Sequence, residues 1–378
     1  ASSPDPQTSA GTFFKKIKLS KTQPLGRLAM LSAILLVCAQ CSARVDKHIT
    51  AGVLDVGSPK TVFVGTTRVL GQDGRFTFDR SPQLQFLRTI VSIPPNRSVG
   101  SISKARGIPD PATHFAMAEK HIYSSASSFA QDLSRSIANT AATEREVTVY
   151  VHGFNNTFSD AAFRIAQLGH DLEVPGALVT YSWPSRASAL GYEYDRDSAL
   201  YARDGLEQLL RTIRSAGRPK MVLVAHSMGG VLLMEALRQI EIADPGWAKR
   251  NVQGVILLAP DLDPEVFRKQ LQTFYAVPEP FVVVVSQRDN ILRLSARIRG
   301  EQDRLGNLSD TSTVSDLPIS IIDVSAFTDR STGNHFVTGN SPALLQILRN
   351  SSNLDRQFVV GRQSGAQTLI LRPAAEAR

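Results

Sequence analysis

Cysteine is nearly absent from this chain of 378 residues, because both of its cysteines, Cys38 and Cys41, lie close to the N-terminus. The rest of the chain therefore has no disulfide, no thiolate metal site and no cysteine nucleophile. The seven histidines also lack the spacing of metal ligands. We expect a protein that needs neither a metal nor another cofactor.

Two further features are missing, a concentrated basic surface and a long apolar run. The net charge is +8, but residues 1–43 account for +4 of it and the remaining +4 is spread thinly. Proteins that track phosphates cluster their Lys and Arg side chains, so we expect no nucleic-acid partner. The apolar run at residues 28–39 is shorter than the roughly 20 residues of a comfortable membrane span.

Residues 1–43 are typical of a bacterial export signal, because a basic stretch precedes the short apolar run and small residues follow it. We expect export to the periplasm or association with a membrane, although a surface helix could share the pattern. Ordinary cleavage after Cys41 or Ala43, an uncleaved anchor, and a lipoprotein signal with Cys41 acylated all remain open. Gln40 departs from the lipoprotein pattern, which favours a small residue before the cysteine.

The remaining chain divides into three segments by its patterns. Residues 44–145 contain short β-branched runs that predict strands, a stretch rich in Pro, Gly and Ser at 96–125 that we expect to be a long loop, and a helix at 127–141. Residues 146–350 alternate between strands and helices, and residues 351–378 form a tail without a clear pattern.

The middle segment predicts the fold class. The expected strands are 145–154, 176–183, 220–226, 252–260, 281–287 and 318–325, and the expected helices are 157–172, 198–217 and 231–240. The strands are continuous apolar runs, as in a parallel sheet that is buried on both faces. We therefore predict an α/β fold with a mostly parallel central sheet and helices on both faces.

Ser227 stands where the strand at 220–226 passes directly into a helix. Such a strained strand–turn–helix needs small residues two before and two after the serine. Ala225 and Gly229 meet this need, although Gly is more usual at the first place. The turn lifts the hydroxyl clear of the sheet and aims the amide of Met228 and the helix N-terminus at it. Ser227 is therefore the candidate nucleophile.

A second loop, at His152–Asn155, ends another expected strand. Gly153 allows a close backbone approach, and the amide of Phe154 is the candidate second oxyanion donor beside that of Met228. His152 is a possible base, but we favour a role in which its ring shapes the loop.

A serine hydroxyl is a poor nucleophile until a base takes its proton, and the base needs an orienting acid. In this type of fold the acid and then the histidine follow the serine. His335 is the only histidine after Ser227, and it lies among Gly, Asn and Thr as a loop base should. His335 is therefore the predicted base.

Four aspartates are considered as the acid. Asp289 lies just past the strand at 281–287, the usual position, and is favoured. Asp261 and Asp263, past the preceding strand, remain alternatives. Asp323 lies inside a strand pattern, so we expect it to be structural.

The motifs HGFNN, YSWPS, AHSMGG and APD resemble those of a bacterial family within the α/β-hydrolase superfamily of serine hydrolases. The resemblance covers roughly residues 60–350 and implies the α/β-hydrolase fold. It also implies a triad of Ser227, Asp289 and His335, with oxyanion amides at Phe154 and Met228. Members of this family look like esterases or lipases, which implies a small-molecule or lipid-like ester as the substrate.

We therefore expect hydrolysis of carboxylic esters through an acyl-enzyme. A thioesterase or acyltransferase, a peptidase, a lipase proper and a catalytically silent binding protein remain alternatives, although a silent protein would not need all three triad positions filled. Trp183, Tyr192 and Tyr194 are expected either to line an acyl pocket or to pack in the core. Residues 261–280 are too few for a long cap, so we expect an open site that favours short to medium acyl chains.

The substitution Cys41→Ser separates the forms of N-terminal attachment. If Cys41 is acylated, the variant should move from the membrane fraction to the soluble periplasmic fraction, whereas other modes of attachment or cleavage should leave the distribution unchanged. Fractionation of bacteria that express the full chain measures this. Recovery of uncleaved protein in the cytosol would show that the export prediction is wrong.

Overall fold

The computed structural model describes residues 49–141, 145–289, 292, 295, 304–308, 310–327, 337–342, 359–362 and 367–370. The chain divides into two units, Ala1–Ser42 and Ala43–Arg378, and all described residues belong to the second. The expected export segment with Cys41, and also His335, lie outside the described residues. None of the described helices combines the length and apolar character that a membrane span requires.

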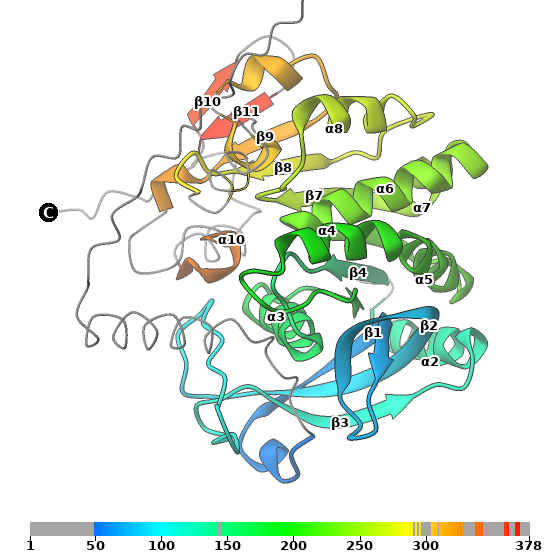
Figure 1. Cartoon of the computed structure of the whole chain (residues 1–378), viewed down its shortest axis with the longest axis vertical. Coiled ribbons are helices and arrows are strands. Elements are labelled where there is room, and N and C mark those ends of the chain that lie inside the picture. The colour runs from blue at the N-terminus through cyan, green and yellow to red at the C-terminus, as the bar shows by residue number, and fades with distance from the viewer. Residues whose placement is uncertain are drawn as a thin grey trace, which may run out of the picture. The chain divides into compact units, whose positions relative to one another are not determined.

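Eleven strands of the described residues form one sheet, in the order β10-β11-β9-β8-β7-β6-β4-β5-β1-β2-β3 (Figure 1). Along the chain they are β1 (Ser58–Leu70), β2 (Phe76–Ile93), β3 (Ala116–Ile122), β4 (Glu146–Val151), β5 (Ala177–Ser182), β6 (Lys220–His226), β7 (Val252–Leu258), β8 (Phe281–Val285), β9 (Ser320–Asp323), β10 (Val359–Arg362) and β11 (Gln367–Ile370). The run from β9 through β5 to β1 is parallel, and antiparallel pairs occur at the two ends. The predicted mostly parallel α/β sheet is confirmed.

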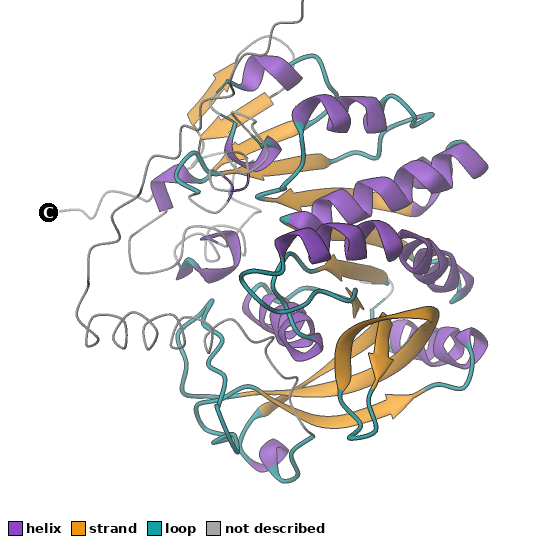
Figure 2. Cartoon of the chain, in the orientation of Figure 1, coloured by secondary structure: helices purple, strands orange, loops and turns teal. Residues whose placement is uncertain are grey.

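Helices cover both faces of this sheet (Figure 2). The α-helices are α2 (Ala126–Ala138), α3 (Phe158–Asp171), α4 (Tyr192–Tyr201), α5 (Arg203–Ser215), α6 (Met228–Ala243), α7 (Trp247–Asn251), α8 (Pro264–Leu271) and α10 (Val337–Asn340), and the 3-10 helices are η1 (Val53–Asp55), η3 (Leu305–Asn307), η4 (Thr311–Val314) and η5 (Ser325–Phe327). Alternate residues of β4 face opposite ways, because Val149 packs with α2, α5 and α6 whereas Tyr150 packs with α3. Each face therefore has its own apolar layer.

The structure differs from the sequence-based expectation in three places. The expected loop at 96–125 contains β3, an edge strand. The C-terminal half of β3 is largely exposed, so its sequence lacks a strong apolar pattern. The helix expected at 198–217 begins at Tyr192 and is interrupted at Ala202, whose carbonyl accepts a hydrogen bond from Tyr181 Oη at 2.7 Å. The C-terminal segment adds β10 and β11 to the sheet.

The strand order changes direction between β4 and β6. From β4 the chain passes to β5 on one side, and it then returns past β4 to form β6 on the other side. The connection after β4 leads to α3 on one face, whereas the connection after β6 leads to α6 on the opposite face. Ligands of open α/β sheets bind where the connections diverge in this way.

Glu241, near the end of α6, fixes the segments that follow this helix. Its side chain is buried, and its carboxylate accepts hydrogen bonds from the amides of Gly246 at 2.9 Å, Ala248 at 2.7 Å and Tyr275 at 3.1 Å. Three backbone donors therefore depend on one acidic group.

We predict that Glu241→Ala lowers the free energy of unfolding by about 3 kcal/mol, because the buried amides of Gly246 and Ala248 would lose their acceptor at about 1–3 kcal/mol each. Glu241→Gln should lose less, since it keeps one carbonyl oxygen. Urea unfolding followed by the fluorescence of Trp247, in the adjacent α7, measures both variants. Equal urea midpoints for Glu241→Ala and the wild type would contradict this prediction.

Candidate active site

Ser227 forms the turn between β6 and α6, with φ 54° and ψ −125°. Such a backbone costs about 1–3 kcal/mol for a residue other than Gly, and it persists only where its surroundings hold it. The Ser227 amide donates to Leu258 O at 2.9 Å, and Ser227 O accepts from the amides of Gly230 at 2.9 Å and Asp261 at 3.2 Å. The turn is thus tied to its own helix and to the end of β7.

Two glycines allow the loop after β4 to touch this turn. A Cβ atom on Gly229 would lie 2.4 Å from His152 O and 2.5 Å from Val151 O. A Cβ atom on Gly153 would lie 2.9 Å from Ser227 Cβ. Any side chain at either glycine would push the loop after β4 and the Ser227 turn apart, so their close contact requires both glycines.

Two backbone amides flank this contact. Phe154 directly follows Gly153, and Met228 is the first residue of α6, where an N–H group has no acceptor within the helix and the helix dipole favours negative charge. Within the part of the chain that the structure describes, neither amide donates a hydrogen bond. Amides in this setting can stabilise a negatively charged oxygen that forms beside Ser227.

His152, considered above as a base, is completely buried. Its ring stacks on Trp183 with 4.9 Å between centroids, and its Nδ1 lies 2.9 Å from Gly153 O. Burial lowers the pKa of His152 to about 3, and the nearby charge of Arg68 acts in the same direction. The imidazole is therefore neutral near pH 7, with Nδ1 donating to the Gly153 carbonyl.

The four candidate acids lie in different surroundings. Asp289 follows β8 and is fully buried, and its Oδ1 accepts from the Leu292 amide at 3.0 Å. Asp263 caps α8, with Oδ1 2.9 Å from the amides of both Glu265 and Val266. Asp323 accepts from the amide and the hydroxyl of Ser325.

Asp261 belongs to a buried network beside the site. Its Oδ1 accepts from Arg304 Nε at 2.9 Å and from Ser295 Oγ at 2.8 Å, and its Oδ2 accepts from Tyr192 Oη at 2.7 Å. The Tyr192 ring also meets the Phe154 ring edge to face, with 5.6 Å between centroids. The two carboxylate oxygens of Asp261 thus join the segment after β7 to the start of α4 and to the segment after β8.

The other two aromatic residues considered for an acyl pocket pack in the fold. Trp183 is fully buried and donates from Nε1 to His152 O at 2.7 Å. Tyr194 donates from Oη to Phe78 O in β2 at 2.9 Å. Of the three aromatic residues, Tyr192 is the one that contacts Phe154.

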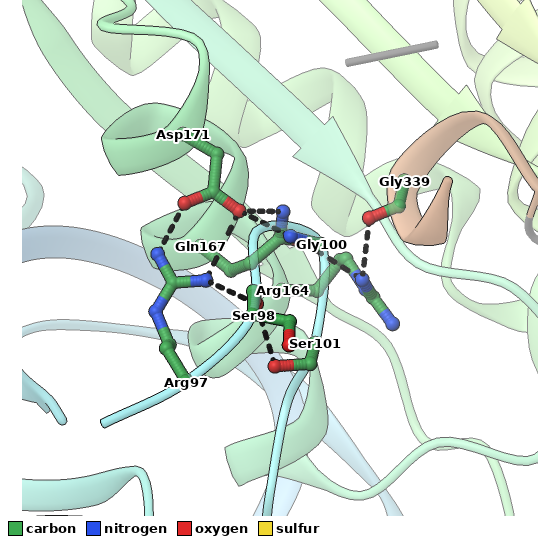
Figure 3. A network of polar contacts seen from close by, with 8 residues as sticks. All are labelled: Arg97, Ser98, Gly100, Ser101, Arg164, Gln167, Asp171 and Gly339. Atoms are coloured by element: carbon green, nitrogen blue, oxygen red, sulfur yellow. Dashed lines mark hydrogen bonds and ion pairs between the residues drawn. The ribbon is translucent and has the colours of Figure 1, made fainter. Parts of the chain in front are cut away.

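His335 lies outside the described residues, but the segment that follows it can be placed. Arg164 of α3 donates from Nη1 to Gly339 O of α10 at 3.3 Å (Figure 3). Burial lowers the pKa of Arg164 to about 10, so the guanidinium is still charged near pH 7. The chain just beyond His335 is therefore attached to the helix that follows the Phe154 loop.

The C-terminal end of α3 is anchored by Asp171. Its carboxylate accepts from the Arg97 guanidinium, from Gln167 Nε2 at 2.7 Å and from the Gly100 amide at 2.8 Å (Figure 3). Burial acts to raise the pKa of Asp171, but these hydrogen bonds outweigh it and hold the pKa below the ordinary value of a carboxyl. The loop between β2 and β3 is thereby held against α3.

Three buried polar residues around the Phe154 loop are not among the candidates predicted from the sequence: Arg68, Ser185 and Asp195. Arg68 stands within an otherwise uncharged stretch of β1, which was a signal that it has a buried partner. Ser185 belongs to the YSWPS motif, and Asp195 lies in the first turn of α4. No group of three or more His, Cys, Asp and Glu side chains among the described residues is arranged to hold a metal ion.

Residues 125–351 match a family model described as an alpha/beta hydrolase of unknown function (DUF900). No curated protein is significantly similar in sequence. Similar solved structures include dienelactone hydrolase from Anabaena variabilis, with 11% identity over 78% of this chain and 96% of that chain and a TM-score of 0.36. A predicted CIB-like hydrolase from Thermoplasma acidophilum has 18% identity over 57% and 88%, with a TM-score of 0.34. A monoacylglycerol lipase from Paleococcus ferrophilus has 14% identity over 55% and 95%, with a TM-score of 0.33.

We predict that Gly229→Ala slows the reaction of Ser227 with a fluorophosphonate probe by about 100-fold, because the added Cβ would displace the turn from the Val151 and His152 carbonyls, and a displacement of about 1 Å is enough for such a loss. Gly230→Ala is the matched control, since its Cβ would meet Pro260 Cβ at 3.2 Å without approaching these carbonyls. Labelling rates on folded protein measure both. Equal rates for the two variants would refute the steric argument.

Proposed function

The chain belongs to the family of alpha/beta hydrolases whose model it matches, and we propose that it is a serine hydrolase that cleaves carboxylic esters. The observation that carries the proposal is the strained Ser227 turn in contact with the Gly153 loop, at the point where the connections of the sheet diverge. Acyl transfer requires a serine hydroxyl beside backbone amides that can bind an oxyanion, and the proposal assigns these roles to Ser227 and to the amides of Phe154 and Met228.

Asp289 is proposed as the acid of the triad. Asp261 uses both carboxylate oxygens in a buried network, whereas Asp263 and Asp323 are only half-buried. Asp289 is buried at the end of β8, and it lies between the serine and the histidine in the chain order typical of this fold. His335 is proposed as the base because it is the only histidine after Ser227.

The reaction proceeds in two steps. Ser227 Oγ attacks the acyl carbon while His335 takes the hydroxyl proton, and Asp289 holds the imidazole in the required tautomer. The amides of Phe154 and Met228 bind the oxyanion, and removing one such donor raises the barrier by about 3–4 kcal/mol. The ester C–O bond then breaks and the alcohol leaves with the proton from His335. A water molecule, deprotonated by His335, attacks the acyl-enzyme and releases the carboxylic acid and Ser227.

The proposed substrates are esters with short to medium acyl chains. Between β7 and β8 the chain forms α8 alone, and all of residues 259–280 are described. This connection therefore supplies no large cap that would enclose a long chain. Nitrophenyl esters of graded chain length test this assignment, and rates that peak at the longest chains and rise at an oil–water interface would identify a lipase instead.

We predict that Ser227→Ala abolishes both fluorophosphonate labelling and ester hydrolysis while the protein stays folded. His335→Ala should be nearly as damaging, and the double variant should be little worse than either single one, because the residues act as a unit. Asp289→Asn should lose far more activity than Asp263→Asn, whose effect should be limited to stability. Steady-state rates and circular dichroism of the purified proteins measure these effects.

The pH dependence gives a further check on the base. Activity should rise with pH through about 6.5, the range in which an ordinary imidazole loses its proton. His152 cannot produce this limb, because burial lowers its pKa to about 3.

A folded, correctly processed wild type that takes no fluorophosphonate label would instead identify a catalytically silent member of the fold. Labelling that is lost in Asp263→Asn but kept in Asp289→Asn would show that the acid assignment is wrong.

A further inference from the structure

Residues Gly153–Asn156, called the oxyanion loop below, have no helical or strand structure, yet side chains fix their backbone. Five backbone polar atoms of this loop form hydrogen bonds with side chains. Asn155 has a φ of 61°, in the left-handed region. A short loop with such a backbone needs external partners to keep one conformation.

The direction of the Phe154 N–H follows from the bonds to the preceding carbonyl. Gly153 O accepts from His152 Nδ1 at 2.9 Å and from Asn156 Nδ2 at 3.1 Å. The Gly153 carbonyl and the Phe154 N–H belong to one planar trans peptide, so they point in opposite directions. Two donors on the carbonyl therefore turn the N–H away from them and prevent this peptide from flipping.

Asn156 can act in this way because its own backbone is held at both ends. Its amide donates to Ser185 Oγ at 3.0 Å, and its carbonyl accepts from Arg68 Nη2 at 2.8 Å. Its side chain also donates to Phe154 O at 2.8 Å. The loop is thereby fastened to β1 and to the segment after β5.

Asp195 is the centre of these attachments. Its Oδ2 accepts from the Asn155 amide at 3.1 Å and from Ser185 Oγ at 2.6 Å, and its Oδ1 accepts from the Arg186 amide at 2.6 Å. Arg68 donates from Nη1 to Ser185 O at 3.0 Å. Asp195 and Arg68 are 0% and 1% exposed, respectively. Ionised groups are expensive to bury, so a carboxylate and a guanidinium here indicate a specific geometric role.

We propose that Asp195, together with Arg68, is a positioning residue that fixes the oxyanion loop, so that the Phe154 N–H points at the oxyanion of the reaction. The inference rests on the ester hydrolysis proposed above. The hydrogen bonds of Asp195 go to Asn155, Ser185 and Arg186 rather than to Ser227. Asp195 acts through Asn155, Ser185 and the backbone of Asn156.

The substitution Asp195→Asn tests this role. The carboxylate now accepts three hydrogen bonds, and the amide nitrogen of Asn cannot accept, so at least one of the three donors would lose its partner. We expect kcat per active site to fall about 10- to 100-fold with KM changed less than about twofold, since losing one oxyanion donor outright costs about 100- to 1,000-fold. Active sites are counted from the final extent of fluorophosphonate labelling. The inhibition constant of a trifluoromethyl ketone, whose serine adduct carries an oxyanion, should rise by the same factor as kcat falls.

Two further variants complete the experiment. Glu193→Gln alters an exposed carboxylate in the same turn of α4, paired with Arg196, and should leave both constants at wild-type values. Asn156→Ala removes the donors to Gly153 O and Phe154 O from a half-buried side chain, and it should shift kcat and the ketone constant in parallel as Asp195→Asn does. Asn156→Ala carries the test if Asp195→Asn does not fold.

The outcomes separate this inference from the function on which it rests. If Asp195→Asn or Asn156→Ala only lowers the number of labelled sites, with kcat per site and ketone binding unchanged, the residues are merely structural and the inference is overturned. If KM rises while kcat stays constant, the loop does not act on the oxyanion and the inference again fails. If wild-type Ser227 neither labels nor hydrolyses esters, the proposed function fails and the inference falls with it.

Discussion

The close backbone contact between Gly229 and the carbonyls of Val151 and His152 is the constraint on which the site depends. It is possible only because β4 and β6 are neighbours and their connections leave on opposite faces of the sheet. The contact places the strained Ser227 turn beside the oxyanion loop. On its other side, the turn donates its amide to the Leu258 carbonyl at the end of β7. Three adjacent strand ends thus determine one small region.

Buried carboxylates organise the loops around this region, and each serves a different purpose. Asp195 holds the Phe154 loop, Asp261 joins Tyr192 to Arg304, and Asp171 anchors the far end of α3. Glu241 orders the segment beyond α6 through three amides. The pattern explains how these acidic side chains can be buried: each has backbone or side-chain donors that replace water.

The sheet could be predicted well because its central strands are continuous apolar runs separated by amphipathic helices. The strand at 220–226, with Ser227 after it, is of this kind, and the α/β-hydrolase assignment from sequence is confirmed by the family match. β3 was missed because an edge strand exposes half of its residues. The early start of α4 was missed because its first turn is charged. The partner of Arg68 could not be predicted, because the Asn156 carbonyl lies nearly ninety residues later in the chain.

The choice among the candidate acids also depended on long-range structure. Asp261, Asp263 and Asp289 all follow strands, and sequence position favoured Asp289 without showing the surroundings of any of them. What separates them is which donors the fold brings to each carboxylate, such as Arg304 to Asp261. The assignment of His335 rests on chain order, because this residue lies outside the described part of the structure.

The pairing of β1 with β5 has a consequence for where this protein can be divided. The family match begins at residue 125, but β1 covers one side of β5 and supplies Arg68 to the Asn156 carbonyl. A fragment cut at the family boundary would leave β5 as a bare sheet edge, open to pairing with other chains. The smallest fragment that keeps this sheet intact therefore begins before Ser58. The exposed turn at residues 72–74, between β1 and β2, is a more suitable place to insert a tag than the start of α2.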